Sequence, residues 1–193
     1  MKQSLFLTAF LALLAFSVAA QTEKPAELKT VGSLDLKRYS GKWFEIARYP
    51  NKFQEKCAGN TTATYTLKTD GKVEVLNQCV KKDGTLESAR GEARIKDKAA
   101  NAKLEVRFAP KIVSFLPNVW ANYWVIELDQ NYEYAVVGDP KRKYLWVLSR
   151  KPEMSDALYQ GLLRKAEAHG FNPGKLQKTP QNMELLKGGV IEN

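Results

Sequence analysis

The sequence contains few of the side chains that build metal centres and nucleophilic active sites. Its 193 residues include two cysteines and one histidine. Zinc sites usually take three or four protein ligands drawn mainly from these two residue types, and the two cysteines are distant from each other in the chain. His169 has no serine or cysteine partner in a recognisable motif, which argues against a nucleophile–histidine triad. We therefore expect no metal site and no catalytic site.

Motifs for nucleotide binding and metalloprotease activity are absent as well. The chain has no G-x-x-x-x-G-K-[ST] loop, no G-x-G-x-x-G turn and no H-E-x-x-H pair. The net charge is +9, but the basic clusters at 81–82 and 141–143 are typical of solvated turns and lack the pattern of a nucleic-acid-binding surface. We expect no cofactor, no nucleic-acid partner and no enzymatic activity. With 44% hydrophobic and 26% charged residues, the composition is that of a folded globular protein.

The one long apolar run lies at the N-terminus, at 5–18. A transmembrane helix needs about 20 apolar residues, so a membrane anchor is the less favoured interpretation and a secretory signal is the favoured one. Lys2 precedes the run, and small residues ending at Ala20 follow it, as at a signal-peptidase site. We expect a cleaved signal peptide at 1–20, a loose polar lead-in at 21–33, one domain at 34–180 and a tail at 181–193.

Export places both cysteines in an oxidising compartment, where disulfide pairing is the default. A bacterial periplasm is the favoured destination, and eukaryotic secretion is the alternative. No cysteine lies near the predicted cleavage site, so we do not expect a lipid anchor on an N-terminal cysteine.

Short alternating runs dominate the rest of the chain, and turn residues separate them. In the run at 72–80, for example, Val75, Asn77 and Cys79 share one face. Eight strands are predicted, at 43–49, 61–68, 72–80, 85–95, 102–109, 122–128, 132–138 and 143–149. Their even spacing and hairpin-length loops favour an all-β fold, either a sandwich or an eight-stranded antiparallel up-and-down β-barrel. Such a barrel is wide enough to hold one small ligand.

One helix is predicted after the last strand, between an N-cap at Ser155 and a C-terminal glycine, Gly170. Leu158, Leu162 and Ala166 give it an apolar stripe of helical period. We expect this C-terminal helix to pack outside the barrel, with a short strand and a tail over 176–190.

Loop lengths distinguish the two ends of such a barrel, because successive loops alternate between them. The loops at 50–60, 81–84, 110–121 and 139–142 share one end and include the longest, so this end is the predicted mouth. The turns at 69–71, 96–101 and 129–131 close the base.

This topology brings two pairs of residues together. Trp43 and Arg150 meet at the base, where the guanidinium would stack over the indole and seal the barrel. Cys57 and Cys79 meet at the mouth, where a disulfide would stabilise the fold by roughly 3 kcal/mol.

Three sequence blocks resemble the lipocalin family. They are G-K-W-F-E-I-A-R at 41–48, Y-W-V-I-E-L-D at 123–129 and Y-L-W-V-L-S-R at 144–150, in the family's order. The set is most similar to the subgroup of bacterial lipocalins, apolipoprotein D and plant temperature-induced lipocalins, over about 34–178. The resemblance implies a calyx that binds a fatty acid or lysophospholipid, and a structural signature of Gly41, Trp43 and Arg150. The chain lacks the lipobox cysteine of outer-membrane members and the cysteine placement of apolipoprotein D.

Interior positions alternate along each strand of a barrel, and this alternation selects candidate ligand contacts. Tyr144 and Trp146 share the parity of Arg150, Glu45 would be a buried carboxylate, and Tyr65 matches a pocket tyrosine of the resembled subgroup. The residues expected to bind the ligand are Glu45, Tyr65, Val75, Asn77, Phe108, Tyr144 and Trp146. The alternative is that these side chains simply fill the core, above all near the base.

The mouth loop at 110–121 is rich in apolar residues, among them Phe115, Leu116 and Trp120. These side chains either contact an anionic membrane or a partner, or fold over the calyx as a lid. Two further functions stay open. Cys79 could act as the nucleophile of a lipocalin-type enzyme on a bound lipid, or the protein could dock a partner and keep only a vestigial pocket.

Overall fold

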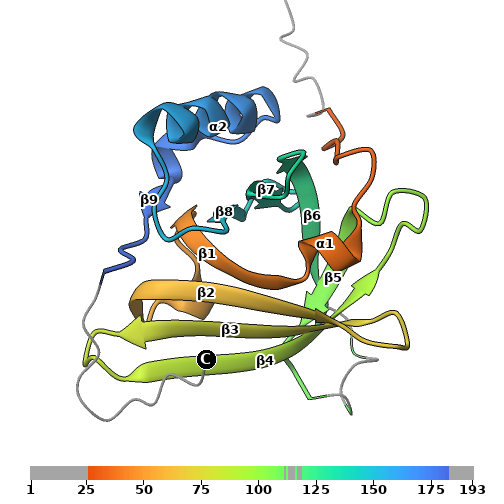
Figure 1. Cartoon of the computed structure of the whole chain (residues 1–193), viewed down its shortest axis with the longest axis horizontal. Coiled ribbons are helices and arrows are strands. Elements are labelled where there is room, and N and C mark those ends of the chain that lie inside the picture. Colours follow the sequence, from red (N-terminus) through yellow and green to blue (C-terminus); the bar gives the residue numbers. More distant parts are fainter. Residues whose placement is uncertain (1–25, 111, 113–115, 117–118, 183–193) are drawn as a thin grey trace, which may run out of the picture.

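The computed structural model describes residues 26–110, 112, 116 and 119–182. Within them, nine strands form one antiparallel sheet in the order β2-β3-β4-β5-β6-β7-β8-β1-β9, and the pairing of β1 with β2 closes it into a barrel (Figure 1). The strands are β1 (Gly41–Arg48), β2 (Cys57–Leu67), β3 (Val73–Lys81), β4 (Leu86–Ile95), β5 (Lys103–Arg107), β6 (Ala121–Leu128), β7 (Tyr134–Gly138), β8 (Leu145–Ser149) and β9 (Gln177–Lys178). The helices of the same residues are α1 (Leu36–Tyr39) and α2 (Asp156–Ala168). The predicted eight-stranded barrel with a C-terminal helix is confirmed, and β9 is the short strand expected within 176–190.

Strand ends differ from the predicted ones where pairing or the backbone overrides the sequence pattern. β2 begins at Cys57 instead of residue 61, because Cys57 already pairs with β3. β7 begins at Tyr134 instead of residue 132, because Tyr132 has a φ of 64°, outside the extended region. β5 ends at Arg107, so Phe108 lies just beyond the strand.

Two features near the N-terminus differ from the prediction, which had a loose lead-in at 21–33 and no helix before the first strand. Leu28 is buried in a cluster with α2, and the carbonyl of Ala26 accepts a hydrogen bond of 2.6 Å from Arg142. Helix α1 then precedes β1, and Asp35 caps it by accepting hydrogen bonds from two backbone amides. A helix of four residues is too short to show a 3.6-residue period, so the pattern could not reveal it.

Apolar side chains form two cores, one on each face of the curved sheet. The interior core contains Trp43, Val75 and Val125, while the outer core contains Ile126 and its neighbours beneath α2. Adjacent residues of β6 thus enter different cores, because side chains alternate between the two faces of a strand.

Helix α2 covers the outer face of the barrel, as predicted (Figure 1). The Oγ of Ser155 accepts a hydrogen bond from the backbone N–H of Leu158 at its N-terminus. Gly170 follows its C-terminus with a φ of 82°, a conformation that favours glycine. The helix ends predicted from the sequence are therefore confirmed by the structure.

Trp43 and Arg150 meet at the base. The Arg150 guanidinium carbon lies 3.9 Å from the centre of the Trp43 ring, and the indole Nε1 donates a hydrogen bond of 2.8 Å to the carbonyl of Tyr39. Arg150 also donates to the carbonyls of Arg38 and Lys42, at 2.7 and 2.9 Å. These contacts tie α1 and the start of β1 to the end of β8 and close this end of the barrel.

The mouth end of β2 is held on two sides. Cys57 and Cys79 form a disulfide to β3 with a Cα–Cα distance of 5.6 Å, which confirms the predicted pair. On the other side, the segment after β9 bridges β1 and β2, because Gln181 Nε2 donates to the carbonyls of Glu45 and Thr61 at 2.7 and 3.0 Å.

Candidate functional site

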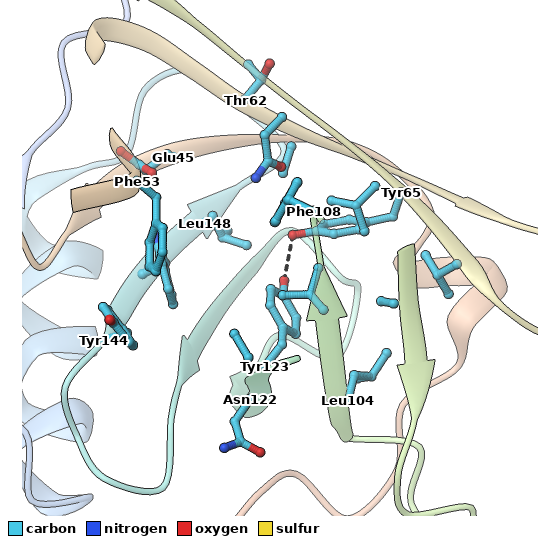
Figure 2. Close-up of a pocket in the computed structure, with 18 of the residues that line it drawn as sticks. Glu45, Phe53, Thr62, Tyr65, Leu104, Phe108, Asn122, Tyr123, Tyr144 and Leu148 are labelled. Atoms are coloured by element: carbon cyan, nitrogen blue, oxygen red, sulfur yellow. Dashed lines mark hydrogen bonds between the residues drawn. The ribbon is translucent and has the colours of Figure 1, made fainter. Parts of the chain in front are cut away.

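A cavity of about 350 Å³ occupies the barrel interior. Its wall is largely apolar and includes Val73, Ala93, Leu104 and Leu148 from four strands. It extends from Leu36 and Tyr39 of α1 at the base to residues of the mouth loops. Figure 2 shows side chains from the surrounding strands converging on this space.

All seven side chains that the sequence selected as ligand contacts line this cavity: Glu45, Tyr65, Val75, Asn77, Phe108, Tyr144 and Trp146. They occupy different depths. Tyr65 and Val75 are paired across β2 and β3 toward the base, while Phe108 is 43% exposed at the rim. Tyr144 stacks on Trp146 with ring centres 5.9 Å apart. Alternation along the strands, and for Tyr65 the family resemblance, thus placed these residues on the cavity wall. Their contact with a ligand is a proposal taken up below.

Glu45 is a buried carboxylate held by a hydrogen-bonded cluster on the mouth side of the cavity. Its Oε1 accepts from Thr179 Oγ1 at 2.6 Å and from Arg48 Nη1 at 3.0 Å, and its Oε2 accepts from Gln54 Nε2 at 2.6 Å. Gln54 Oε1 in turn accepts from the indole of Trp146 at 3.1 Å. The sequence predicted a buried carboxylate here but not these partners, which come from the end of β1, a loop and the C-terminal segment.

Three tyrosine hydroxyls meet deeper in the cavity. The hydroxyl of Tyr123 lies 2.8 Å from that of Tyr39 and 2.8 Å from that of Tyr65, and Figure 2 shows Tyr65 and Tyr123 pointing toward each other. Burial away from water raises the pKa of all three hydroxyls above the usual value of 10.0. All three are therefore neutral at physiological pH. We name this cluster of Tyr39, Tyr65 and Tyr123 the tyrosine triad.

Sequence reasoning selected one member of the triad and missed two. Tyr123 lies two residues before Val125 on β6, and this alternation was a signal that it faces the interior. Tyr39 gave no comparable signal, because it belongs to the short helix α1. Its position depends on the way that α1 folds across the base of the barrel.

Two further polar atoms beside the cavity have no hydrogen-bond partner among the described residues. They are Asn77 Oδ1 and Thr61 Oγ1, both buried. The described lining residues include no lysine, arginine or histidine, and Glu45 is the one aspartate or glutamate among them. The cavity is thus apolar with isolated neutral polar groups, and it offers no cation to an anionic group buried within it.

The mouth loop divides between buried and exposed residues. Trp120 is half-buried, with the guanidinium carbons of Arg94 and Arg107 at 4.0 and 5.0 Å from its ring centre. Ile112 and Leu116 are exposed, at 81% and 43%. Phe115 lies outside the described residues. The Trp120 ring is therefore partly covered by arginine side chains, whereas the side chains of Ile112 and Leu116 are exposed to solvent.

The two alternative functions find little support in this geometry. Cys79 is bonded to Cys57, so neither of the two cysteines carries the free thiol that a nucleophile requires. The cavity is open instead of filled by side chains, which argues against a vestigial pocket. His169 contacts Glu127 at 3.0 Å, outside the cavity.

Within the described residues there is no helix long and apolar enough to cross a membrane. The same part of the chain contains no group of three or more histidine, cysteine or acidic side chains able to hold a metal ion.

An antiparallel barrel that is closed at its base and encloses an apolar cavity is the architecture of a binding protein for small hydrophobic molecules. The family model described as a lipocalin-like domain matches residues 34–181, and the chain belongs to the lipocalin family. The resemblance found in the sequence is thereby confirmed. Lipocalins bind small hydrophobic ligands in the barrel interior.

The relatives come from plants, bacteria and animals. The chain is 42% identical to temperature-induced lipocalin-1 of Arabidopsis thaliana over 164 residues, covering 83% of this chain and 86% of the relative. It is 38% identical to the outer membrane lipoprotein Blc of Escherichia coli K12 over 152 residues, covering 78% and 81%. It is 32% identical to mouse apolipoprotein D over 158 residues, covering 77% and 78%.

Solved structures with lower identity share the fold. Insecticyanin from the tobacco hornworm Manduca sexta superimposes with a TM-score of 0.62 at 22% identity, covering 79% of this chain and 84% of that one. Lobster apocrustacyanin A1 gives a TM-score of 0.59 at 15% identity, covering 76% and 79%. At these identities the comparison supports the barrel architecture alone.

Proposed function

We propose that this protein is an exported lipocalin that holds the acyl chain of a fatty acid or lysophospholipid in its calyx, for storage, transport or scavenging. The observation that carries the proposal is the largely apolar cavity of about 350 Å³ inside the closed barrel. Small-molecule pockets commonly measure about 300–1,000 Å³. Each methylene group that leaves water for such a wall contributes up to about 0.8 kcal/mol before entropic losses.

The charges of the cavity favour one orientation of such a lipid. An anionic headgroup would find no cation among the described lining residues, and it would approach the buried carboxylate of Glu45. At the mouth the same headgroup stays in water. We infer that the acyl chain enters first and that the headgroup remains at the mouth.

A variant that fills the calyx tests this proposal. Ala63 faces the cavity from β2, and we expect Ala63→Trp to weaken binding of a fluorescent long-chain fatty acid at least about tenfold, since the indole occupies the space of the chain. Thr66→Trp places the same indole on an exposed position of the same strand and should bind like the wild type. Binding is measured by fluorescence titration, and bound lipid by native mass spectrometry. A folded wild-type barrel that binds no long-chain lipid contradicts the proposal.

Export is the second component of the proposal. It is supported by the apolar N-terminal run at 5–18 in the sequence and by the disulfide, which is typical of oxidising compartments. One group of relatives is named as outer membrane lipoproteins. We propose the periplasm as the compartment, with secretion as the alternative.

We further propose that the mouth contacts an anionic membrane. Phe53, Ile112 and Leu116 expose large apolar side chains there, at 72%, 81% and 43%. The mouth loops also carry exposed basic residues: Lys52, Lys56, Lys82, Lys141 and Lys143. Exposed apolar side chains together with exposed cations complement the interface of a bilayer that contains anionic lipids.

Charge reversal at one end of the barrel tests the membrane contact. We expect Lys82→Glu/Lys141→Glu to reduce co-sedimentation with vesicles of phosphatidylglycerol and phosphatidylcholine several-fold, because each basic residue near such a surface contributes about 1 kcal/mol. The matched control is Lys37→Glu/Lys98→Glu, which makes the same change of net charge at the base. Equal losses for both variants would show that net charge acts without any docking by the mouth.

A further inference from the structure

The tyrosine triad has more hydrogen-bond donors than its members can use. Three hydroxyl groups carry three hydrogens, and the two contacts of 2.8 Å at Tyr123 use two of them. One hydroxyl hydrogen therefore has no acceptor among the described residues, whichever direction the chain of bonds takes. All three side chains line the cavity, so this donor is available to a ligand there.

Unused acceptors lie on the same wall. Tyr65 pairs with Val75 across β2 and β3, and Asn77 follows two residues nearer the mouth, about 7 Å along the strand. The Oδ1 of Asn77 and the Oγ1 of Thr61 are both buried, and neither has a hydrogen-bond partner in the part of the chain that the structure describes. A buried polar group without a partner costs free energy of folding. A ligand that satisfies the triad and Asn77 would recover this cost on binding.

These unpaired groups of the protein determine which chemical group of a ligand would suit this part of the cavity. A bare methyl end leaves the donor and the acceptors unpaired, while a carboxylate or phosphate would be desolvated with no cation beside it. A neutral hydroxyl avoids both costs because it donates one hydrogen bond and accepts others. The triad lies toward the base, where Tyr39 packs on Trp43 with ring centres 4.9 Å apart, so the far end of the chain is the part that reaches it.

We propose that the calyx prefers acyl chains that carry a hydroxyl group at or near the end remote from the headgroup, and that the tyrosine triad and Asn77 bind this hydroxyl. The inference rests on the proposed function, in which the acyl chain enters first, and it specifies the subclass of lipid. An apolar calyx without this site would bind a hydroxylated chain less tightly than its parent, because removing a hydroxyl from water costs free energy. The proposal thus predicts the opposite order of affinities.

Matched pairs of fatty acids test the proposal: palmitate against ω-hydroxypalmitate, and laurate against ω-hydroxylaurate. Each pair has the same chain length and the same carboxylate. We expect the wild-type protein to bind the hydroxylated member of at least one pair about tenfold more tightly, which corresponds to about 1.4 kcal/mol. Affinities are measured by displacement of a fluorescent fatty acid.

Variants then locate the preference. Tyr65→Phe/Tyr123→Phe and, separately, Asn77→Leu should reduce the ratio of affinities within each pair to parity or below. Tyr134→Phe removes a hydroxyl from the outer core and should leave the preference unchanged. Because the wild-type comparison needs no variant, a folding defect in one of them does not prevent the test.

The failure of this inference is distinguishable from the failure of the proposed function. If the parent acids bind as tightly as their hydroxylated partners or more tightly, the preference is refuted while lipid binding stands. If the preference persists in both triad and Asn77 variants, the assigned site is wrong. If no member of either pair binds, the proposed function fails as well.

Discussion

Replacing Trp43 by alanine is expected to lower the free energy of unfolding by about 3–5 kcal/mol, the usual range for a fully buried tryptophan. The side chain has no exposed surface, and the space it leaves cannot collapse easily because β1 is paired on both sides. The Arg150 guanidinium loses the ring that lies 3.9 Å away, and the carbonyl of Tyr39 loses its indole donor. Urea unfolding followed by circular dichroism measures the change.

Trp124→Ala is the matched control for this substitution. Trp124 is half-buried on the outer core, and its ring lies 4.5 Å from the ammonium group of Lys103. This substitution also removes an indole but leaves the base of the barrel filled, so we expect less than half of the loss in free energy of unfolding. Equal losses for the two variants would contradict the view that the Trp43–Arg150 contact closes the barrel.

The second large effect is expected from removing the disulfide. We expect Cys57→Ala/Cys79→Ala to destabilise the fold by roughly 3 kcal/mol. The crosslink joins residues 22 positions apart and so lowers the conformational entropy of the unfolded chain. Alanine is preferable to serine because Cys79 is buried and a serine hydroxyl there would need a hydrogen-bond partner. The measurement is again equilibrium unfolding in urea.

A reductant gives an independent check on the disulfide. Adding it to the wild-type protein should produce the same loss of stability as the double substitution, while the double variant itself should not respond. A wild-type protein whose stability is insensitive to reductant, or a double variant as stable as the wild type, would show that this crosslink does not restrain the unfolded chain.

Period-two alternation explains why so much of the calyx could be predicted from the sequence. Parity along an antiparallel barrel assigns each inward residue and each loop to one end. It placed Trp43 and Arg150 together at the base and Cys57 and Cys79 together at the mouth, as the structure has them. It also directed Val75, Asn77 and Trp146 to the interior, where they line the cavity, whereas Tyr65 was selected by the resemblance to the lipocalin subgroup.

Alternation makes no prediction for residues that lie outside regular strands. Tyr39 comes from a helix of four residues, and Gln54 comes from a 3-10 turn in a mouth loop. Thr179 lies in the segment after β9 yet donates a hydrogen bond to Glu45, 134 residues earlier in the chain. Such contacts depend on how irregular segments pack against the barrel, and the periodicity of the sequence does not indicate where these segments lie.

The sequence by itself therefore determined the barrel, its mouth and base, its disulfide and the inward face of the strands at 43–49, 72–80, 102–109 and 143–149, because alternation, loop length and the resemblance to the lipocalin family carry those features. Only the tertiary structure decided how the polar groups around the cavity are arranged and hydrogen-bonded. It brought Tyr39 and Tyr123 to Tyr65 and surrounded Glu45 with Arg48, Gln54 and Thr179. It also left Asn77 Oδ1 without a hydrogen-bond partner among the described residues. The physical reason is that hydrogen-bond partners are set by distances of about 3 Å between atoms, and those distances arise only when the chain has closed.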